Sequence, residues 1–432
     1  MSPHRPHRIA ALLTGAALAV GMLTSLPAHA SPSAHPRPVD ARRPDFGPNV
    51  TIFSPATPLA EIRTTLTDLA AAQVDDEMGT ARHAVYFLPG DYGTATEPLQ
   101  FQVGYYTEVA GLGATPGDVR VNGAIEVYNR CLENDGTSNC LALTNFWRTL
   151  ANLTLEVNKA GQDPCRSTAN FWAVSQAVSL RRVQVTGSVQ LSLMDYCTAG
   201  PQYASGGFIA DSKLPTVVNG SQQQWLTRNS EVGSWSNGVW NQVFSGVIGA
   251  PDDAAFPDPP YTTIERTPVS REKPYLYVDG AGKYFVRVPE ARQNTRGVSW
   301  DGGRTAGRSV PISDFFIATP EDSARTINAA LARGKHLILT PGVYDIDRTI
   351  RVTRPGTVVL GLGHATLTAA KGAVPMEVSD APGIVVAGVT FDAGERLSPV
   401  LLRIGTDHGK ARHHSSRNPN TLNDGYFRVG GP

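Results

Sequence analysis

The sequence predicts an all-β protein made of two tandem β-solenoid modules, each headed by one α-helix. A strand–turn–strand pattern occurs twice, in residues 83–113 and 336–363, and 252 residues separate its prolines, Pro89 and Pro341. A helix-like segment precedes each copy. Short strands then follow one another every roughly 20–25 residues, which is the period of a β-solenoid. A β-sandwich or jelly roll is the alternative, but a leading helix favours a solenoid, whose open strand edges it would cover.

The N-terminus has the pattern of a secretory signal peptide. A basic start is followed by the apolar residues 9–26 and by an A-x-A cleavage site that ends at Ala30. The apolar stretch is too short and too rich in alanine to favour a membrane anchor. We therefore expect residues 1–30 to be removed, residues 31–48 to be a flexible leader, and the protein to be secreted and extracellular.

The charge balance narrows the choice of partner. The chain has 38 basic and 38 acidic side chains, so its formal net charge is zero. This argues against nucleic acid and against a membrane surface as partners. We expect a neutral polymer or a small neutral ligand to be bound. Apart from the charge balance, we also expect the protein to be a monomer without a cofactor or a metal.

The chain contains four cysteines: Cys131, Cys140, Cys165 and Cys197. An even number in a secreted chain indicates two disulfides, for which three pairings are possible. We favour Cys131–Cys140, which closes a short loop, together with Cys165–Cys197. Zinc is the alternative, but the spacings match no zinc pattern and no histidine is nearby.

The elements can be assigned in order. Residues 58–73 are predicted to form a helix with Thr57 as N-cap and Pro58 at its first position, and Thr319-Pro320 is expected to start a second helix. The apolar faces of the two helices are formed by Leu59, Ile62, Leu66 and Leu69 and by Ile327, Ala330 and Leu331. Strands are expected at 84–88, 146–155, 171–185, 189–193, 207–210, 224–230, 238–246 and 337–339.

These elements divide the chain into two modules and a connector. We assign 49–250 to the first module, 251–308 to a connector with a β-hairpin at 273–288, and 309–432 to the second module. The second module is shorter and finishes in a strand and a turn rather than a cap. We therefore expect its solenoid to be incomplete and the chain to be truncated.

The Gly-Leu-Gly sequence at 111–113 does not predict a dinucleotide loop. It follows no βαβ unit, and it recurs at 361–363. The repetition indicates a structural turn between rungs.

Carboxylates are the first place to look for hydrolytic chemistry. Cleavage of a glycosidic bond normally needs two carboxyl groups about 5–9.5 Å apart. The first module offers Asp195, Asp211 and Glu231, and no recognisable motif pairs them. We expect each to be a solvated turn residue or a cap at a strand end.

A polar and aromatic cluster at 221–242 is the stronger candidate site. Period-two alternation places Gln222 and Gln224 on one face of a strand. Amides bond sugar hydroxyls, and indole rings cover the apolar side of a sugar. The remaining candidates are Trp225, Trp235, Trp240 and Asn241. A glutamine or asparagine ladder with stacked aromatics inside the solenoid is the alternative reading.

Several motifs in order resemble the bacterial branch of glycoside hydrolase family 55, over roughly residues 45–432. They include LANLTL, WAVSQAVSLRRV, ASGGFIADSK, GSQQQW, VWNQVF and KPYLYV. The resemblance implies two tandem right-handed parallel β-helices of the pectate-lyase-like kind. It also implies an exo-acting, inverting β-1,3-glucanase that acts on laminarin-type glucans without a metal.

The resemblance also implies roles for individual residues. Gln222 and Gln224 resemble the amides that hold the nucleophilic water and the substrate, and Trp235 and Trp240 resemble subsite aromatics. The family's general acid is a glutamate that would follow Pro432, so we expect this chain to be weakly active or inactive. A glucan-binding fragment without activity is the alternative function. A polysaccharide lyase is disfavoured, because it would need a basic or calcium-lined groove.

Overall fold

The computed structural model places the compact unit Pro38–Pro432, apart from short gaps. The described residues are 40–42, 44–134, 137–141, 143–187, 190–197, 204–220, 224–236, 240–252, 256–405 and 415–429, without the side chains of 130–134 and 137–141. The predicted signal peptide, the leader up to residue 39 and Gln222 lie outside this part of the chain.

The first module is a parallel β-helix, as predicted. One of its strand ladders runs through successive rungs from the N-terminal end to the connector. In spatial order its strands are β1 (Val50–Phe53), β2 (His83–Phe87), β5 (Thr107–Gly111), β9 (Arg148–Val157), β11 (Val178–Thr186), β13 (Gly206–Ala210), β15 (Gln224–Arg228), β17 (Gln242–Ser245) and β18 (Tyr261–Ile264). Since β18 pairs with β17, this ladder continues past residue 250, where we expected the connector to begin.

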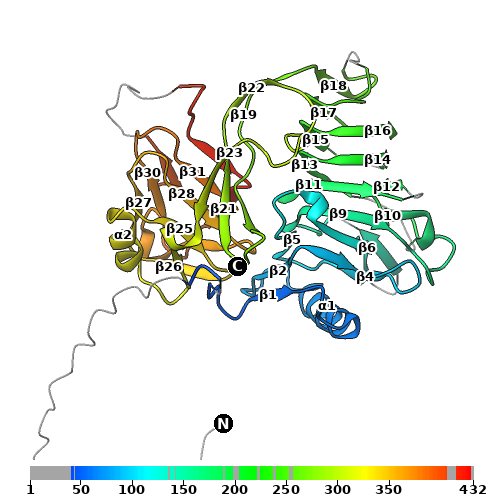
Figure 1. Cartoon of the computed structure of the whole chain (residues 1–432), viewed down its shortest axis with the longest axis horizontal. Helices are drawn as coiled ribbons and strands as arrows, with labels where there is room; N and C mark the ends of the chain where they lie inside the picture. The colour runs from blue at the N-terminus through cyan, green and yellow to red at the C-terminus, as the bar shows by residue number, and fades with distance from the viewer. Residues whose placement is uncertain are drawn as a thin grey trace, which may run out of the picture. The chain divides into compact units, whose positions relative to one another are not determined.

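Further parallel pairings complete the rungs of the first module. Their strands are β3 (Gly90–Tyr92), β4 (Leu99–Gln102), β6 (Val119–Glu126), β10 (Ala169–Phe171), β12 (Gln190–Ser192), β14 (Lys213–Val218) and β16 (Glu231–Ser236). Figure 1 shows most of them stacked above helix α1 (Leu59–Gln73), which packs beside β4. A small antiparallel pair, β7 (Arg130–Asn134) and β8 (Thr137–Leu141), extends from this module.

The connector is antiparallel. Strands β19 (Thr267–Ser270) and β22 (Arg292–Thr295) form one pair. The expected hairpin consists of β20 (Tyr275–Val278) and β21 (Tyr284–Pro289), and β23 (Gly307–Pro311) pairs with β21.

The second module is a parallel β-helix with three sheets. The first contains β24 (Phe315–Ala318), β25 (His336–Leu339), β28 (Val358–Gly361), β31 (Val385–Ala387) and β34 (Thr421–Asn423). The second contains β26 (Val343–Ile346), β29 (Thr366–Ala369), β32 (Thr390–Asp392) and β35 (Tyr426–Arg428). The third contains β27 (Ile350–Val352), β30 (Met376–Val378) and β33 (Leu402–Ile404). Helix α2 (Ala324–Ala332) packs beside β24, β25 and β27.

Both helices exist, but neither begins as predicted. The Thr57 hydroxyl accepts a hydrogen bond from the Ser54 amide in the preceding turn, so it does not cap α1. Helix α2 is capped by Ser323, whose hydroxyl accepts from the Thr326 amide at 3.1 Å. The earlier Thr319-Pro320 belongs to a turn that the Asp322 carboxylate closes.

The rungs vary more in length than the predicted period allows. In register, Leu180 lies 30 residues after Leu150, whereas Phe244 lies 17 residues after Thr227. Turns of different length absorb the difference. The predicted strand 171–185 is two strands separated by a turn, and β14 and β16 were missed because Pro215 and Gly233 interrupt their apolar pattern.

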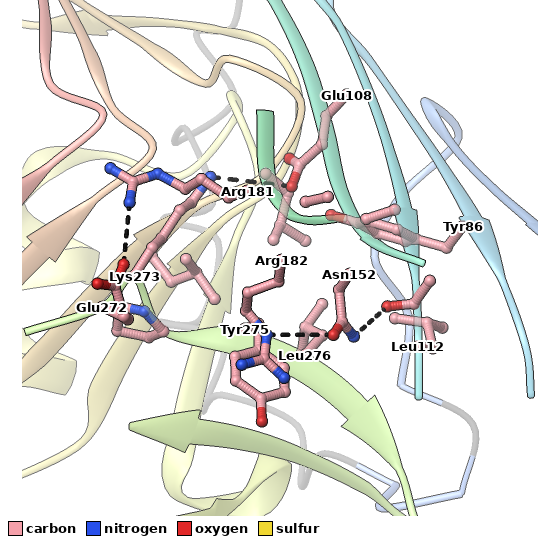
Figure 2. Close-up of a pocket in the computed structure, with 16 residues that line it drawn as sticks. Tyr86, Glu108, Leu112, Asn152, Arg181, Arg182, Glu272, Lys273, Tyr275 and Leu276 are labelled. Carbon is pink, nitrogen blue, oxygen red and sulfur yellow. Dashed lines mark hydrogen bonds and ion pairs between the residues drawn. The ribbon is translucent and has the colours of Figure 1, made fainter. Parts of the chain in front are cut away.

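A third apolar cluster joins the two β-helices, each of which also has its own core. It brings together Leu112 and Leu362, the central residues of the two Gly-Leu-Gly turns. Figure 2 shows the adjoining pocket, where Asn152 donates to the Gly111 carbonyl at 2.8 Å and accepts from Arg182 at 3.2 Å. The duplicated turn is thus a structural element that the modules use to pack together.

Candidate sugar-binding edge

One edge of the long ladder of the first module carries amide, hydroxyl and aromatic side chains on five successive rungs. The residues lie at or just before the first residues of β9, β11, β13, β15 and β17, and the parallel register places these strand starts side by side. They are Trp147, Gln176, Ser205, Gln224 and Asn241. We call this set the edge row.

Gln176 and Ser205 form the centre of the edge row. The Gln176 side-chain amide donates to the Ser205 carbonyl at 3.2 Å, and the Ser205 hydroxyl donates to Gln176 Oε1 at 2.9 Å. Gln176 is exposed and Ser205 is half-buried. An amide has two donors and two acceptor lone pairs, and a hydroxyl accepts as well as donates. The pair therefore keeps bonding capacity for a water or a sugar hydroxyl.

The backbone around this pair requires glycine. Gly206 has a φ of +114°, and a Cβ there would lie 1.9 Å from the Gln224 carbonyl oxygen. A side chain at this position would separate two neighbouring rungs at the point where Ser205 and Gln224 approach each other. Glycine thus allows these two members of the edge row to lie together.

Aromatic rings lie toward both ends of the row. Trp147 is half-buried and stacks on Tyr106, with 4.9 Å between the ring centroids. The guanidinium of Arg428, from the second module, lies 5.9 Å from the Trp147 ring. At the other end Trp240 is 49% exposed, next to the half-buried Asn241. An exposed indole ring close to amide side chains suits a carbohydrate.

The three tryptophans assigned to one cluster from the sequence, Trp225, Trp235 and Trp240, lie in different environments in the structure. Trp225 is only 2% exposed and belongs to the core of the first β-helix, so its predicted role in substrate binding is wrong. Trp235 lies on β16, outside the ladder that carries the edge row, and its ring packs edge-on against Phe244 at 5.0 Å. Gln224 is exposed at the start of β15, and Asn241 accepts a hydrogen bond from Thr262.

Trp147, Gln176 and Ser205 were missed by sequence reasoning. Each lies one or two residues before a strand, and Gln176 and Ser205 lie within the motifs WAVSQA and ASGGF. Comparing the residues that precede successive strands, rather than searching one polar segment, would have identified them.

Each of the three candidate carboxylates forms an ion pair with a basic side chain. Asp195 pairs with Arg166 at 2.8 Å, Asp211 pairs with Arg182 at 3.1 Å, and Glu231 pairs with Lys213 at 3.3 Å. Asp195 and Asp211 are fully buried, which corrects the expectation that they are solvated. Burial and the neighbouring Glu272 raise the pKa of Asp211 to about 6, although Arg182 opposes them.

The structure tests one of the two predicted disulfides. Cys165 and Cys197 form a disulfide with 5.7 Å between their Cα atoms, as predicted. Cys131 and Cys140 face each other in the register of β7 and β8, but their side chains lie outside the described part, so this disulfide stays a prediction. Within the described ranges, no three His, Cys, Asp or Glu residues gather to hold a metal. No helix in the same ranges is long and apolar enough to cross a membrane.

The fold places the chain in the class of tandem parallel β-helix proteins, and comparison with known proteins makes the class more precise. Residues 315–432 match the family model described as the LAM55 pectate lyase-like domain. The chain is 44% identical to an exo-beta-1,3-glucanase of Streptomyces sp. SirexAA-E, over 100% of this chain and 67% of that protein.

Two solved structures of sacteLam55A, from the same Streptomyces strain, are similar. One superposes with a TM-score of 0.80 at 43% identity and covers 90% of this chain and 65% of that one. The other is a glutamate-to-alanine variant in complex with glucose, with a TM-score of 0.80, 42% identity and 91% and 66% coverage. The chain belongs to glycoside hydrolase family 55. It spans about two thirds of the length of these relatives.

Proposed function

We propose that the protein hydrolyses laminarin-type β-1,3-glucan from a chain end, with inversion at the anomeric carbon. The relative named exo-beta-1,3-glucanase supports the reaction and the substrate class. The observation that carries the proposal for this chain is the hydrogen bonding between the exposed Gln176 and the half-buried Ser205, in a row with aromatic residues toward both ends. A neutral glucan also fits the zero net charge and the predicted secretion signal.

In this proposal the edge row positions the sugar and the attacking water. An inverting enzyme needs a water on the face of the sugar opposite the leaving group and an acid that protonates the leaving oxygen. Gln176 and Ser205 have the donors and acceptors to hold that water or the hydroxyls beside it. Gln224 continues the polar surface on the next rung, and Trp240 and Trp147 cover ring faces.

A second function, glucan binding without turnover, is favoured by the state of the buried carboxylates. Glu272 is paired with Arg228, and Asp424 is paired with Arg181 and Lys273. Although burial opposes them, these cations lower the pKa of both carboxyl groups, which makes the two groups poor proton donors. Both functions use the same edge row.

One experiment separates the two functions. Laminarin is incubated with the protein, and glucose release is followed by a reducing-sugar assay and by proton NMR. Inverting hydrolysis of a β-linkage gives the α-anomer of glucose first. Binding of laminari-oligosaccharides is measured in parallel by calorimetry. Release of α-glucose supports hydrolysis, and saturable binding without release supports the binding function. The absence of both would refute the proposed function.

Variants locate the site. Gln176→Ala and Ser205→Ala each remove half of the central pair and should reduce turnover or affinity by about tenfold or more, as expected for one or two lost hydrogen bonds. Gln293→Ala is the matched control, because Gln293 is an exposed glutamine outside the edge row whose side chain donates to Ser416. If the control and Gln176→Ala behaved alike, the edge row would not be the site.

A further inference from the structure

A second polar pocket lies between the connector and the second module. It encloses about 1140 Å³, including its open mouth, and it lies apart from the edge row. Three arginines from different segments line it: Arg271 after β19, Arg308 on β23 and Arg417 before β34. Glu290 is the one carboxylate among its described lining residues. We call this hollow the arginine pocket.

Arg271 is buried, and no carboxylate among the described residues pairs with its guanidinium. It is 9% exposed, and its two terminal nitrogens donate to the Pro419 carbonyl and to Asn418 Oδ1, both at 2.9 Å. Both acceptors are neutral. A guanidinium has five N–H donors, and its Nε finds no partner among the described residues. Buried arginines are normally paired with a carboxylate or another anion, because burying an uncompensated charge is costly.

The neighbouring Arg308 adds a second positive charge near Arg271 and does not compensate the first. Burial lowers the pKa of Arg271, and the charge of Arg308 lowers it further. Arg308 is exposed, and it too donates to a neutral acceptor, the Gly356 carbonyl, at 2.7 Å. Two segments of the connector thus hold like charges close together.

His336 adds an uncharged donor to the lining. Its Nδ1 accepts a hydrogen bond from the Val358 amide at 3.0 Å, so the neutral ring carries its proton on Nε2. Burial and the charge of Arg308 lower the pKa of His336 to about 4, although Asp314 opposes them. At neutral pH this histidine adds no charge. Among the described lining residues, three arginines therefore lie with a single glutamate.

We propose that the arginine pocket binds an oxyanion group, of the phosphate, sulfate or carboxylate type, through Arg271, Arg308 and Arg417. Planar guanidinium groups match the geometry of such anions, and charge-assisted hydrogen bonds to them are about twice as strong as neutral ones. The anion supplies the counter-charge that Arg271 lacks. It is either a free inorganic ion or an acidic group on a polysaccharide, and both present the same oxygens. The site is separate from the proposed glucan site and does not depend on that function.

The test is calorimetric titration of the full chain at constant ionic strength. One arm uses inorganic phosphate with chloride as the balancing salt, and the other uses an oligosaccharide that carries glucuronic acid. Saturable binding of phosphate identifies a free ion as sufficient. Binding of the oligosaccharide alone identifies an acidic sugar. Saturable binding in neither arm overturns the proposal.

Variants assign the binding to the pocket. Arg308→Gln and Arg417→Gln should each raise the dissociation constant about tenfold, because each removes one charge-assisted partner. Both residues are exposed, so these variants decide the question even if Arg271→Gln does not fold. Arg325→Gln, at an exposed position on α2, is the matched control and should bind as the parent does. Unchanged affinity in both Arg308→Gln and Arg417→Gln would overturn the proposal.

Discussion

Arg181 of the first β-helix and Asp424 of the second form a buried ion pair across the boundary between the modules. Arg181 Nη2 lies 2.7 Å and its Nε 2.8 Å from Asp424 Oδ1, and the side chains are 6% and 4% exposed. The Ser179 hydroxyl and Lys273 also contact the carboxylate. Burial alone would raise the pKa of Asp424, but the charges of Arg181 and Lys273 hold it well below its usual range.

Replacing Asp424 should therefore destabilise the junction. Asp424→Asn leaves Arg181 and Lys273 buried without their shared partner, and breaking a buried pair in this way costs about 3–5 kcal/mol. Urea denaturation measures the loss. The control is Asp347→Asn, which removes an exposed pair with Lys371 and should cost less than about 1 kcal/mol. Equal effects of the two variants would show that the junction does not depend on Asp424.

Acid should weaken the same junction through His364. This histidine is buried, lies 3.3 Å from the Thr149 hydroxyl, and stacks on Tyr426. Burial, and then the charges of Lys273 and Arg82, lower its pKa to about 3. In the unfolded chain this imidazole is protonated below about pH 6.5, whereas in the folded chain it stays neutral until about pH 3. The free energy of unfolding therefore decreases as the pH falls from about 6.5 toward 3.

The measurement is the free energy of unfolding at pH 7 and at pH 5. In His364→Gln the difference between the two values should be smaller than in the parent by about 1–2 kcal/mol, since that histidine no longer titrates. His336, whose pKa is also lowered, still titrates in this window and accounts for part of the remaining difference. An identical difference in parent and variant would exclude His364 as the source.

The solenoid could be predicted from the sequence because its signals are local. Strand alternation and the repeated Gly-Leu-Gly turn need only a few neighbouring residues to be recognised. The edge row could not be predicted in this way, since it depends on how distant rungs align. Val178 pairs with Arg148 and Gln242 pairs with Trp225, at separations that follow no fixed period.

The buried position of Trp225, in contrast, could have been predicted from the sequence. Alternation along a strand places neighbouring residues on opposite faces, so an exposed Gln224 requires an inward Trp225. Trp225 was wrongly assigned to the site because all polar and aromatic residues in a segment of about twenty were taken together, without regard to the side of the strand on which each lies. Trp235 shows the limit of the same rule, because residues 224–230 were predicted as one strand and the following strand, β16, was not predicted at all.

Trp240 and Trp225 should respond in opposite ways to alanine substitution. Trp240→Ala removes an exposed ring and should weaken glucan binding about tenfold while changing stability little. Trp225→Ala removes a core side chain and should cost about 3–5 kcal/mol of stability. Calorimetric titration with laminari-oligosaccharides and urea denaturation give the two readings. Unchanged binding in Trp240→Ala would place this tryptophan outside the site.

The Cys165–Cys197 disulfide should contribute to stability by restricting the unfolded chain. Its sequence separation is 32 residues, and a loop of this size is worth about 3–4 kcal/mol by the chain-entropy relation. The double variant Cys165→Ser, Cys197→Ser should unfold at a correspondingly lower urea concentration. A midpoint equal to that of the parent would mean that the crosslink does not restrict the unfolded state.

Gly206→Ala tests whether the edge row depends on the close approach of two rungs. The substitution places a Cβ against the Gln224 carbonyl at a backbone conformation that alanine rarely adopts, so either the rungs separate or the backbone shifts. Ser205 then moves relative to Gln224. Glucan affinity should fall together with stability, the latter by about 1–3 kcal/mol.

Gly280→Ala is the control for Gly206→Ala, because an added Cβ at Gly280 meets nothing within 4 Å. It should leave both glucan affinity and unfolding unchanged. The decisive comparison is made under conditions in which Gly206→Ala is still folded, as judged by circular dichroism. Folded Gly206→Ala that binds glucan as tightly as the parent would show that the spacing of Ser205 and Gln224 does not define the site. Weakened binding by the folded variant would support a glucan site on these rungs, because the substitution acts where Ser205 and Gln224 approach each other.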